Sequence, residues 1–360
     1  MSVQVSYKKQ FGLGLMLLLI MIGIMEISAR TYDIVNPYCN LKTDNEIYSE
    51  LSFWEKSEIC DSWLNIVWGF DKDTGIYVPE ANQHKKTINI NSEGFRGPEI
   101  IKIKQEETKR IFLMGGSTMM SLRATSDGTT IPGYVQDFFD SKNDMNVQII
   151  NAGISSFTST QELELLKKKI LQFNPDIIVV YDGTNDIASS LGYKPGKESL
   201  RSVLADVLNR YFPFWETPIV INHIISPNEI TKIKFDDSDI DKKVKLWKGN
   251  LENICNIGEE NNFETLIILQ PIVGSGTKKL TPYEEEQFEK FDHSKVIPAY
   301  QKFADELNNL KNGCAKVEDF RNIFDEVEHT VFFDNAHVGI KSNKIVAEKI
   351  YGLLSQMISN

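Results

Sequence analysis

The sequence predicts an α/β protein built around an open, doubly wound sheet. From residue 110 onward, short apolar runs alternate with longer amphipathic segments. The stronger apolar runs are continuous, which is typical of parallel strands covered by helices on both faces. Strands that alternate with helices imply right-handed crossovers, and ligands bind such sheets beyond the carboxyl ends of the strands. The residues that follow each strand are therefore the candidates for function.

Five apolar runs are the expected strands, and four amphipathic segments are the expected helices. The strands are expected at 110–114, 147–151, 176–181, 265–270 and, from a weaker pattern, 315–320. The helices are expected at 159–173, 240–261, 297–310 and 340–358. In the first helix Leu163, Leu166 and Ile170 share one side, and Asn174-Pro175 ends it before the third strand. Together these elements predict a mainly parallel five-stranded sheet.

A positively charged flank precedes an apolar segment in the N-terminal part. Lys8 and Lys9 lie before an uncharged, mostly apolar run over 11–25, which Glu26 follows. This pattern is typical of a signal anchor or of a cleaved secretory signal. We expect residues 1–30 to be a retained membrane anchor, with cleavage near Ala29 as the alternative. Because the cationic side tends to stay in the cytoplasm, the rest of the chain is expected outside it in both cases.

The remaining chain divides into two expected parts. Residues 31–109 are interpreted as an extracytoplasmic lead-in segment, because they are rich in Trp, Tyr, Asn and Asp and show no sustained helical period. Residues 110–360 are the expected main domain. An insertion at about 187–241 interrupts this domain. It could be a lid over the strand ends or a peripheral helical hairpin that packs its aromatic side chains on the core.

The composition indicates a folded protein with an acidic surface. Apolar residues make up 41% of the chain and charged residues 25%, as in ordinary globular proteins. The formal net charge is −11 at pH 7, and no dense block of Lys and Arg occurs. Nucleic acid is therefore not expected as a partner, because binding phosphates requires clustered cations. Composition says nothing about the oligomeric state.

Four cysteines fit a compartment outside the cytoplasm. There Cys39 and Cys60 could form a disulfide that closes a short loop. Cys255 and Cys314 are interpreted as plain buried thiols. Four cysteines allow three pairings, so the connectivity stays open. No CxxC motif or Cys/His cluster suggests zinc, and no metal is expected.

Small and polar residues follow the first three expected strands. Ser117 lies in a Gly-Gly-Ser-Thr turn, where its oxygen is exposed and its N–H can point toward whatever that oxygen attacks. Gly153 follows the second strand and offers a further N–H to a closely approaching ligand. Asn185 follows the third strand within a polar cluster. Taken alone, the serine turn is most often structural and Asn185 is more often an Asx turn that caps a helix.

One histidine has a carboxylate at a spacing suited to catalysis. Asp334 and His337 are three residues apart in a short loop before the last expected helix. At this spacing the carboxylate can hold one imidazole nitrogen while the other nitrogen faces a nucleophile. His329 lies beside a charged stretch and is interpreted as solvated. The other three histidines have no comparable arrangement; they are His84, His223 and His293.

The ordered set of Ser117, Gly153, Asn185 and Asp334-x-x-His337 resembles the SGNH hydrolase superfamily of GDSL-like serine esterases and lipases. The resemblance covers roughly residues 110–358. It implies a flavodoxin-like three-layer α/β/α sandwich in which Ser117 is the nucleophile, with Asp334 and His337 as its partners. It also implies an oxyanion hole formed by the N–H groups of Ser117 and Gly153 and by the side chain of Asn185.

The resemblance implies a serine-dependent ester hydrolase of the acyl esterase or deacetylase type, acting outside the cytoplasm without a metal or organic cofactor. One departure is that Gly116 replaces the Asp of the Gly-Asp-Ser motif, which changes the support of the turn. The expected substrates are acyl esters such as acylated glycans or lipids. Two alternatives stay open: an O-acyltransferase that uses the same site on a glycan, and a non-catalytic surface glycan-binding protein of the same fold.

Overall fold

The computed structural model describes residues 6–36, 39, 41, 46–72, 74–142, 146–189, 215, 217–218, 220–221, 235, 238–310 and 313–359. The chain forms two compact units, one of residues 1–43 with 198–229 and one of residues 44–197 with 230–360. Most of the insertion predicted at about 187–241 lies outside the described residues.

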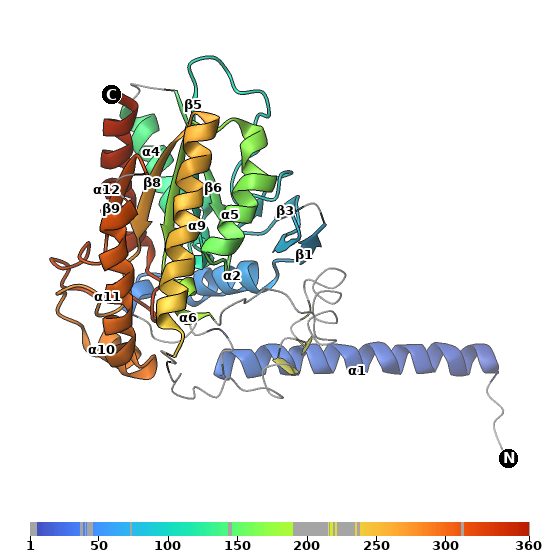
Figure 1. Ribbon diagram of the computed structural model, residues 1–360. Coiled ribbons are helices and arrows are strands. Elements are labelled where there is room, and N and C mark those ends of the chain that lie inside the picture. Colours follow the sequence, from blue (N-terminus) through green and yellow to red (C-terminus); the bar gives the residue numbers. More distant parts are fainter. Residues whose placement is uncertain are drawn as a thin grey trace. The chain divides into compact units, whose positions relative to one another are not determined.

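The larger unit is built on a five-stranded sheet (Figure 1). Its strands are, in spatial order, β6 (Val147–Gly153), β5 (Lys109–Gly115), β7 (Ile177–Asp182), β8 (Glu264–Leu269) and β9 (Lys316–Asp319). Every neighbouring pair among these strands is parallel. The strand order is that of flavodoxin-like folds. The α/β fold with five parallel strands is therefore confirmed.

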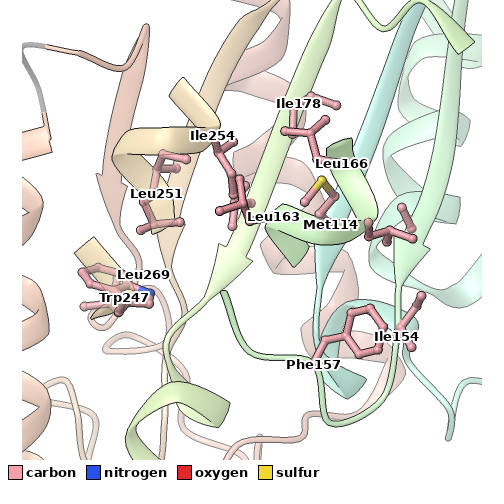
Figure 2. Close-up of a cluster of buried hydrophobic side chains, with 14 of the residues drawn as sticks. Met114, Ile154, Phe157, Leu163, Leu166, Ile178, Trp247, Leu251, Ile254 and Leu269 are labelled. Carbon is pink, nitrogen blue, oxygen red and sulfur yellow. The ribbon is translucent and has the colours of Figure 1, made fainter. Parts of the chain in front are cut away.

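Helices cover both faces of this sheet (Figure 1). The helices of one face are α4 (Ile131–Lys142) and α12 (Ile340–Ser359), and those of the other are α5 (Ser159–Lys168), α9 (Ile240–Asn261) and α11 (His293–Leu310). Alternate side chains of β5 enter the two cores, because successive residues of a strand point to opposite faces. Ile111 joins the core beside α12, and Phe112 joins the core beside α9. Figure 2 shows part of the latter core, including Leu163, Trp247 and Leu251.

Several short elements complete the larger unit. They are α3 (Ser117–Met120), η2 (Asp127–Thr129), η3 (Ile170–Phe173), α6 (Thr184–Ala188) and α10 (Pro282–Lys290). Neither α4 nor α10 was among the predicted helices. The start of α10 has a clear local cause, since Thr281 and Glu284 form a capping box and Pro282 occupies its first turn.

The segment before the sheet contains elements of its own. They are η1 (Glu46–Tyr48), α2 (Phe53–Leu64), the antiparallel pair β1 (Trp68–Asp71) and β2 (Ile76–Pro79), and the pair β3 (Gln83–His84) and β4 (Asn89–Ile90). The helix α2 contradicts the expectation of no sustained helix here. It begins at a capping box between Ser52 and Glu55 and buries a narrow side, which gives a weak apolar period.

Within the larger unit, Arg96 and Phe95 of this segment pack against β5 and the residues that follow it. The Arg96 side chain is fully buried and donates to the carbonyl oxygens of Met120 and Ser121. The Phe95 ring contacts Phe112 of β5 edge to face, with 5.6 Å between ring centroids. The predicted boundary at residue 110 therefore falls inside one compact unit. The division into residues 1–30, 31–109 and 110–360 otherwise stays a prediction.

The smaller unit contains the helix α1 (Tyr7–Val35). With a mean hydropathy of 2.2 over its most apolar window, it is the one helix among the described residues that is long and apolar enough to cross a membrane. The length and the apolar composition of α1 are the features that meet this requirement. They are compatible with either a signal anchor or a cleaved signal.

The cysteines correct one prediction. Cys255 and Cys314 form a disulfide and are not free thiols. Cys255 lies on α9 and Cys314 lies just before β9, and both segments flank β8, which brings the two Cα atoms within 5.0 Å. Cys39 and Cys60 are disulfide-bonded as well.

Candidate active site

Three of the predicted site residues lie at the carboxyl ends of neighbouring strands. Ser117 is the first residue of α3 and follows β5, Gly153 ends β6, and Asn185 lies in α6 after β7. Because β6, β5 and β7 are parallel and adjacent, all three residues are at one edge of the sheet. His337 reaches this edge from the loop before α12.

A chain of hydrogen bonds joins Ser117, His337 and Asp334. The Nε2 atom of His337 lies 2.7 Å from Ser117 Oγ. Its Nδ1 atom lies 2.8 Å from each carboxylate oxygen of Asp334. An ionised carboxylate can only accept hydrogen bonds, so Nδ1 carries the proton and Nε2 is left to accept from the serine hydroxyl. This is the arrangement in which an imidazole can act as the base for a serine nucleophile.

The Asp334 carboxylate is fixed by its surroundings. Its Oδ1 atom accepts hydrogen bonds from the backbone N–H groups of Ala336 and His337, at 3.1 and 2.9 Å. Burial raises the pKa of Asp334. This effect is outweighed by the interaction with the His337 ring, by the hydrogen bonds from His337 and by the nearby Arg123 guanidinium, so the pKa of Asp334 lies below its usual range. The carboxyl group is therefore ionised at neutral pH. Phe333 stacks on the His337 ring, with 6° between the ring planes.

Asn185 contributes an amide to the same place. Its Nδ2 atom donates a hydrogen bond of 2.7 Å to the carbonyl oxygen of Phe157, and Asn185 lines the cavity beside Ser117. A Cβ atom at Gly116 would overlap this amide nitrogen. The glycine that replaces the Asp of the Gly-Asp-Ser motif thus leaves the space that the Asn185 side chain occupies.

Gly153 does not reach the cavity, contrary to the prediction from sequence. Its N–H donates to Oδ1 of Asn151 at 3.0 Å, and it is not among the described residues that line the cavity. A Cβ atom at this position would overlap the backbone nitrogen of Met120, so the glycine is needed for close packing of β6 against α3. The loop that follows supplies Ser155 and Ser156 to the cavity wall instead.

Ser156 has an unusual backbone conformation. Its φ angle is +64°, in the left-handed region that side chains other than glycine rarely adopt. The N–H groups of Ser155 and Ser156 donate no hydrogen bond to any residue that the structure describes. Sequence reasoning missed this loop, because a Ser-Ser pair carries no signal for a positive φ angle. Residues with such strain often occur at functional sites.

The cavity over Ser117 has a volume of about 280 Å³. Its wall combines serine and threonine hydroxyls, two amides, an imidazole, one guanidinium and a few apolar side chains. The described residues that line it are Trp63, Ser117, Thr118, Ser121, Leu122, Arg123, Ala124, Ser155, Ser156, Asn185, Phe333, His337, Val338 and Asn343. The described part of the chain contains no cluster of three His, Cys, Asp or Glu side chains that could hold a metal ion.

Three buried carboxyl groups lie close to one another beside the segment that carries Asn185. They belong to Glu162 of α5, Asp182 at the end of β7 and Asp186 of α6. Burial raises the pKa of each group, and their mutual repulsion raises the pKa of Glu162 and Asp182 further. Asp186 also accepts hydrogen bonds from the backbone N–H and the hydroxyl of Ser159, at 3.0 and 2.6 Å. Both carboxyl oxygens of Glu162 have no hydrogen-bond partner among the described residues.

Replacing Glu162 with glutamine should make the stability of the protein less dependent on pH. A carboxyl group with a raised folded-state pKa binds protons more readily in the folded state, so the free energy of unfolding falls as the pH rises from about 4, the ordinary carboxyl range, toward the upper pH at which the folded-state group ionises. Glu162→Gln should reduce this fall and raise the free energy of unfolding at the upper pH by about 1–3 kcal/mol. The free energy of unfolding at each pH is measured by urea titration, with tryptophan fluorescence as the signal. Glu164→Gln on the outer side of α5 is the control, and an equal pH dependence in all three proteins would contradict the account.

Comparison with protein families gives one match. A family model described as GDSL-like Lipase/Acylhydrolase matches residues 111–350. Among curated proteins, none matches the chain.

Solved structures of similar fold include three that cover about two thirds of the chain. An acetyl xylan esterase has 16% identity and a TM-score of 0.41, covering 68% of this chain and 99% of its own. A GDSL-like lipase from Bacteroides thetaiotaomicron has 14% identity and a TM-score of 0.40, covering 72% and 93%. A catalytic mutant of an acetylxylan esterase from Geobacillus stearothermophilus has 14% identity and a TM-score of 0.40, covering 69% and 94%.

Proposed function

The chain belongs to the GDSL-like lipase/acylhydrolase family and is an ester-hydrolysing serine hydrolase, and from that premise we propose that Ser117 is its nucleophile. His337 removes the proton from Ser117 Oγ, which attacks the ester carbonyl, while Asp334 holds the imidazole and stabilises the imidazolium. His337 then gives the proton to the departing alcohol, and water releases the acyl group from Ser117. The unbroken hydrogen-bond chain from Asp334 through His337 to Ser117 carries the proposal.

The oxyanion of the tetrahedral intermediate needs hydrogen-bond donors beside Ser117. We propose that these are the N–H of Ser117, the side-chain amide of Asn185 and the N–H of Ser156. As the first residue of a helix, Ser117 has no partner for its N–H within that helix. Asn185 and Ser156 both line the cavity. Ser156 takes the place that the sequence assigned to Gly153, whose N–H is already bonded to Asn151.

Hydrolysis of a small acetyl ester tests the proposed function. The full-length chain in detergent should release phenol from an aryl acetate and should be labelled by a fluorophosphonate probe. Release of the acyl group to water marks a hydrolase, whereas its appearance on an added glycan marks an acyltransferase. A folded protein with neither turnover nor labelling would refute the proposal.

Restoring the aspartate of the family motif should harm this enzyme. In Gly116→Asp the new side chain would overlap the Asn185 amide and displace it, so kcat for an aryl acetate should fall about 10- to 100-fold. The control is Gly249→Asp on α9, where an added Cβ atom meets nothing within 4 Å. If Gly116→Asp kept the parent kcat, the position of Asn185 would not matter for turnover.

We propose that α1 holds the enzyme at a membrane, with Lys8 and Lys9 on the cytoplasmic side and the catalytic unit outside. The long apolar helix and its positive flank support this topology. Alkaline phosphatase fused after residue 360 should be active in bacterial cells, since it folds only outside the cytoplasm. An inactive fusion that is still expressed would refute the topology. N-terminal sequencing of the mature protein separates a retained anchor from cleavage near Ala29.

A further inference from the structure

Arg123 is the one arginine, lysine or acidic side chain among the described residues that line the cavity. Its guanidinium lies between the rings of Trp63 and Phe333, 4.9 and 4.2 Å from their centroids. Its backbone oxygen accepts a hydrogen bond of 2.8 Å from the buried hydroxyl of Tyr48. The side chain is only 16% exposed. The cation is therefore held rigidly in a largely dehydrated wall of the cavity.

Among the described residues, none accepts a hydrogen bond from the guanidinium of Arg123. Its Nη1 atom lies 3.6 Å from Oδ2 of Asp334, which is too long for a hydrogen bond. The Arg123 side chain donates no hydrogen bond to any residue that the structure describes. The buried Arg96 differs, since its guanidinium donates to Asp127 and to three backbone oxygens. A largely buried guanidinium that donates no hydrogen bond to the described residues is unfavourable unless a ligand accepts hydrogen bonds from it.

Arg123 lies on the imidazole side of the proposed reaction centre. It is next to Asp334, and it touches the Phe333 ring that stacks on His337. In the proposed mechanism His337 protonates the departing alcohol, so the alcohol part of the ester must lie on this side. The carbonyl oxygen faces the other way, toward the proposed donors Asn185 and Ser156. A group held by Arg123 would therefore belong to the alcohol part of the substrate.

We propose that Arg123 binds a carboxylate on the alcohol part of the ester, so that the substrates are acyl esters of acidic alcohols such as acidic sugars. This rests on the proposed function. The planar fork of a guanidinium matches the two oxygens of a carboxylate. A monoanion fits better than a dianion, because the Asp334 carboxylate is already near the cation.

A matched pair of esters tests the proposal. The full-length chain in detergent is given 3-acetoxybenzoate or its neutral amide, 3-acetoxybenzamide. The parent should show a higher kcat/KM for the carboxylate, by about 10- to 100-fold after correction for spontaneous hydrolysis. Arg123→Met keeps an apolar stem between the two rings but removes the charge. It should abolish the preference, so that the ratio of kcat/KM for the carboxylate to kcat/KM for the amide falls to about one.

A purely structural role of Arg123 gives a different result, namely an equal loss on both esters, which would overturn the proposal. So would a parent without preference, or a preference confined to a carboxylate on the acyl part, measured with phenyl succinate against phenyl butanoate. Arg321→Met is the matched control, because this side chain is also 16% exposed but binds Asp319 outside the cavity. It should leave the preference intact.

Binding without turnover separates this proposal from the proposed function. Calorimetric titration of 3-acetoxybenzoate into Ser117→Ala should show binding that the double variant with Arg123→Met loses by about 10-fold or more. If no ester is hydrolysed by the parent, the proposed function fails, while this titration still decides on Arg123. Equal binding by the single and the double variant would overturn the carboxylate site.

Discussion

Ser117→Ala should reduce kcat for an aryl acetate by roughly a million-fold, leaving only the residual rate that substrate binding and the oxyanion donors supply. The hydroxyl is the only group at the proposed centre that forms a covalent bond to the acyl carbon, so no neighbour can replace it. The change removes one oxygen at the start of a short helix. It should therefore leave the free energy of unfolding almost unchanged, which urea unfolding measures beside the kinetics.

Ser141→Ala is the control for this variant. Ser141 lies on α4, and its exposed hydroxyl bonds only to the carbonyl oxygen of Phe138. It should keep the parent kcat. A stable Ser117→Ala protein that still turned over the ester would show that another nucleophile does the work.

His337→Ala should have an effect of similar size, a loss of about 10⁴- to 10⁶-fold in kcat. Without the imidazole, the Ser117 hydroxyl has no base at 2.7 Å to take its proton, and the departing alcohol has no acid. The Asp334 carboxylate would also lose its main partner. Stopped assays with purified protein at high concentration measure the residual rate.

His329→Ala is the matched control, because His329 is exposed and lies only a few residues before the site. It should keep the parent rate. If His337→Ala lost less than about 10-fold, the imidazole would not be the general base, since such bases contribute at least about 100-fold.

The parallel sheet and most of the helices that cover it could be predicted from the local pattern of apolar residues. The strands β5, β7 and β8 are buried on both faces, so their apolar runs are continuous and identify them. The segment of residues 46–104 gave no such pattern. Its α2 helix buries Lys56 and Ser62 together with Ile59, so its inner side is not apolar throughout. The residues that these side chains pack against lie elsewhere in the chain. The spacing of residues within α2 therefore does not predict which of its sides is buried.

Residues of the candidate site could be predicted where a side chain suited to catalysis directly follows an expected strand or precedes the last helix. Ser117, Asn185 and the Asp334–His337 pair could be named because each stands beside a strand or the last helix in a combination that chemistry restricts. Gly153 was placed wrongly because a glycine after a strand serves close packing as well as ligand approach. Arg123 was missed because its neighbours come from distant segments, and nothing in its local sequence predicts a guanidinium packed against the rings of Trp63 and Phe333.

The most direct test of the account is to locate the covalent adduct after the full-length chain reacts with a fluorophosphonate. Trypsin cleaves after Arg110 and Arg123, which isolates residues 111–123 with Ser117 and Ser121 on one peptide. Fragmentation in the mass spectrometer should place the adduct on Ser117 in the parent and find almost none in His337→Ala. An adduct on Ser121 or elsewhere, or an unlabelled but folded parent, would contradict the claim that His337 activates Ser117.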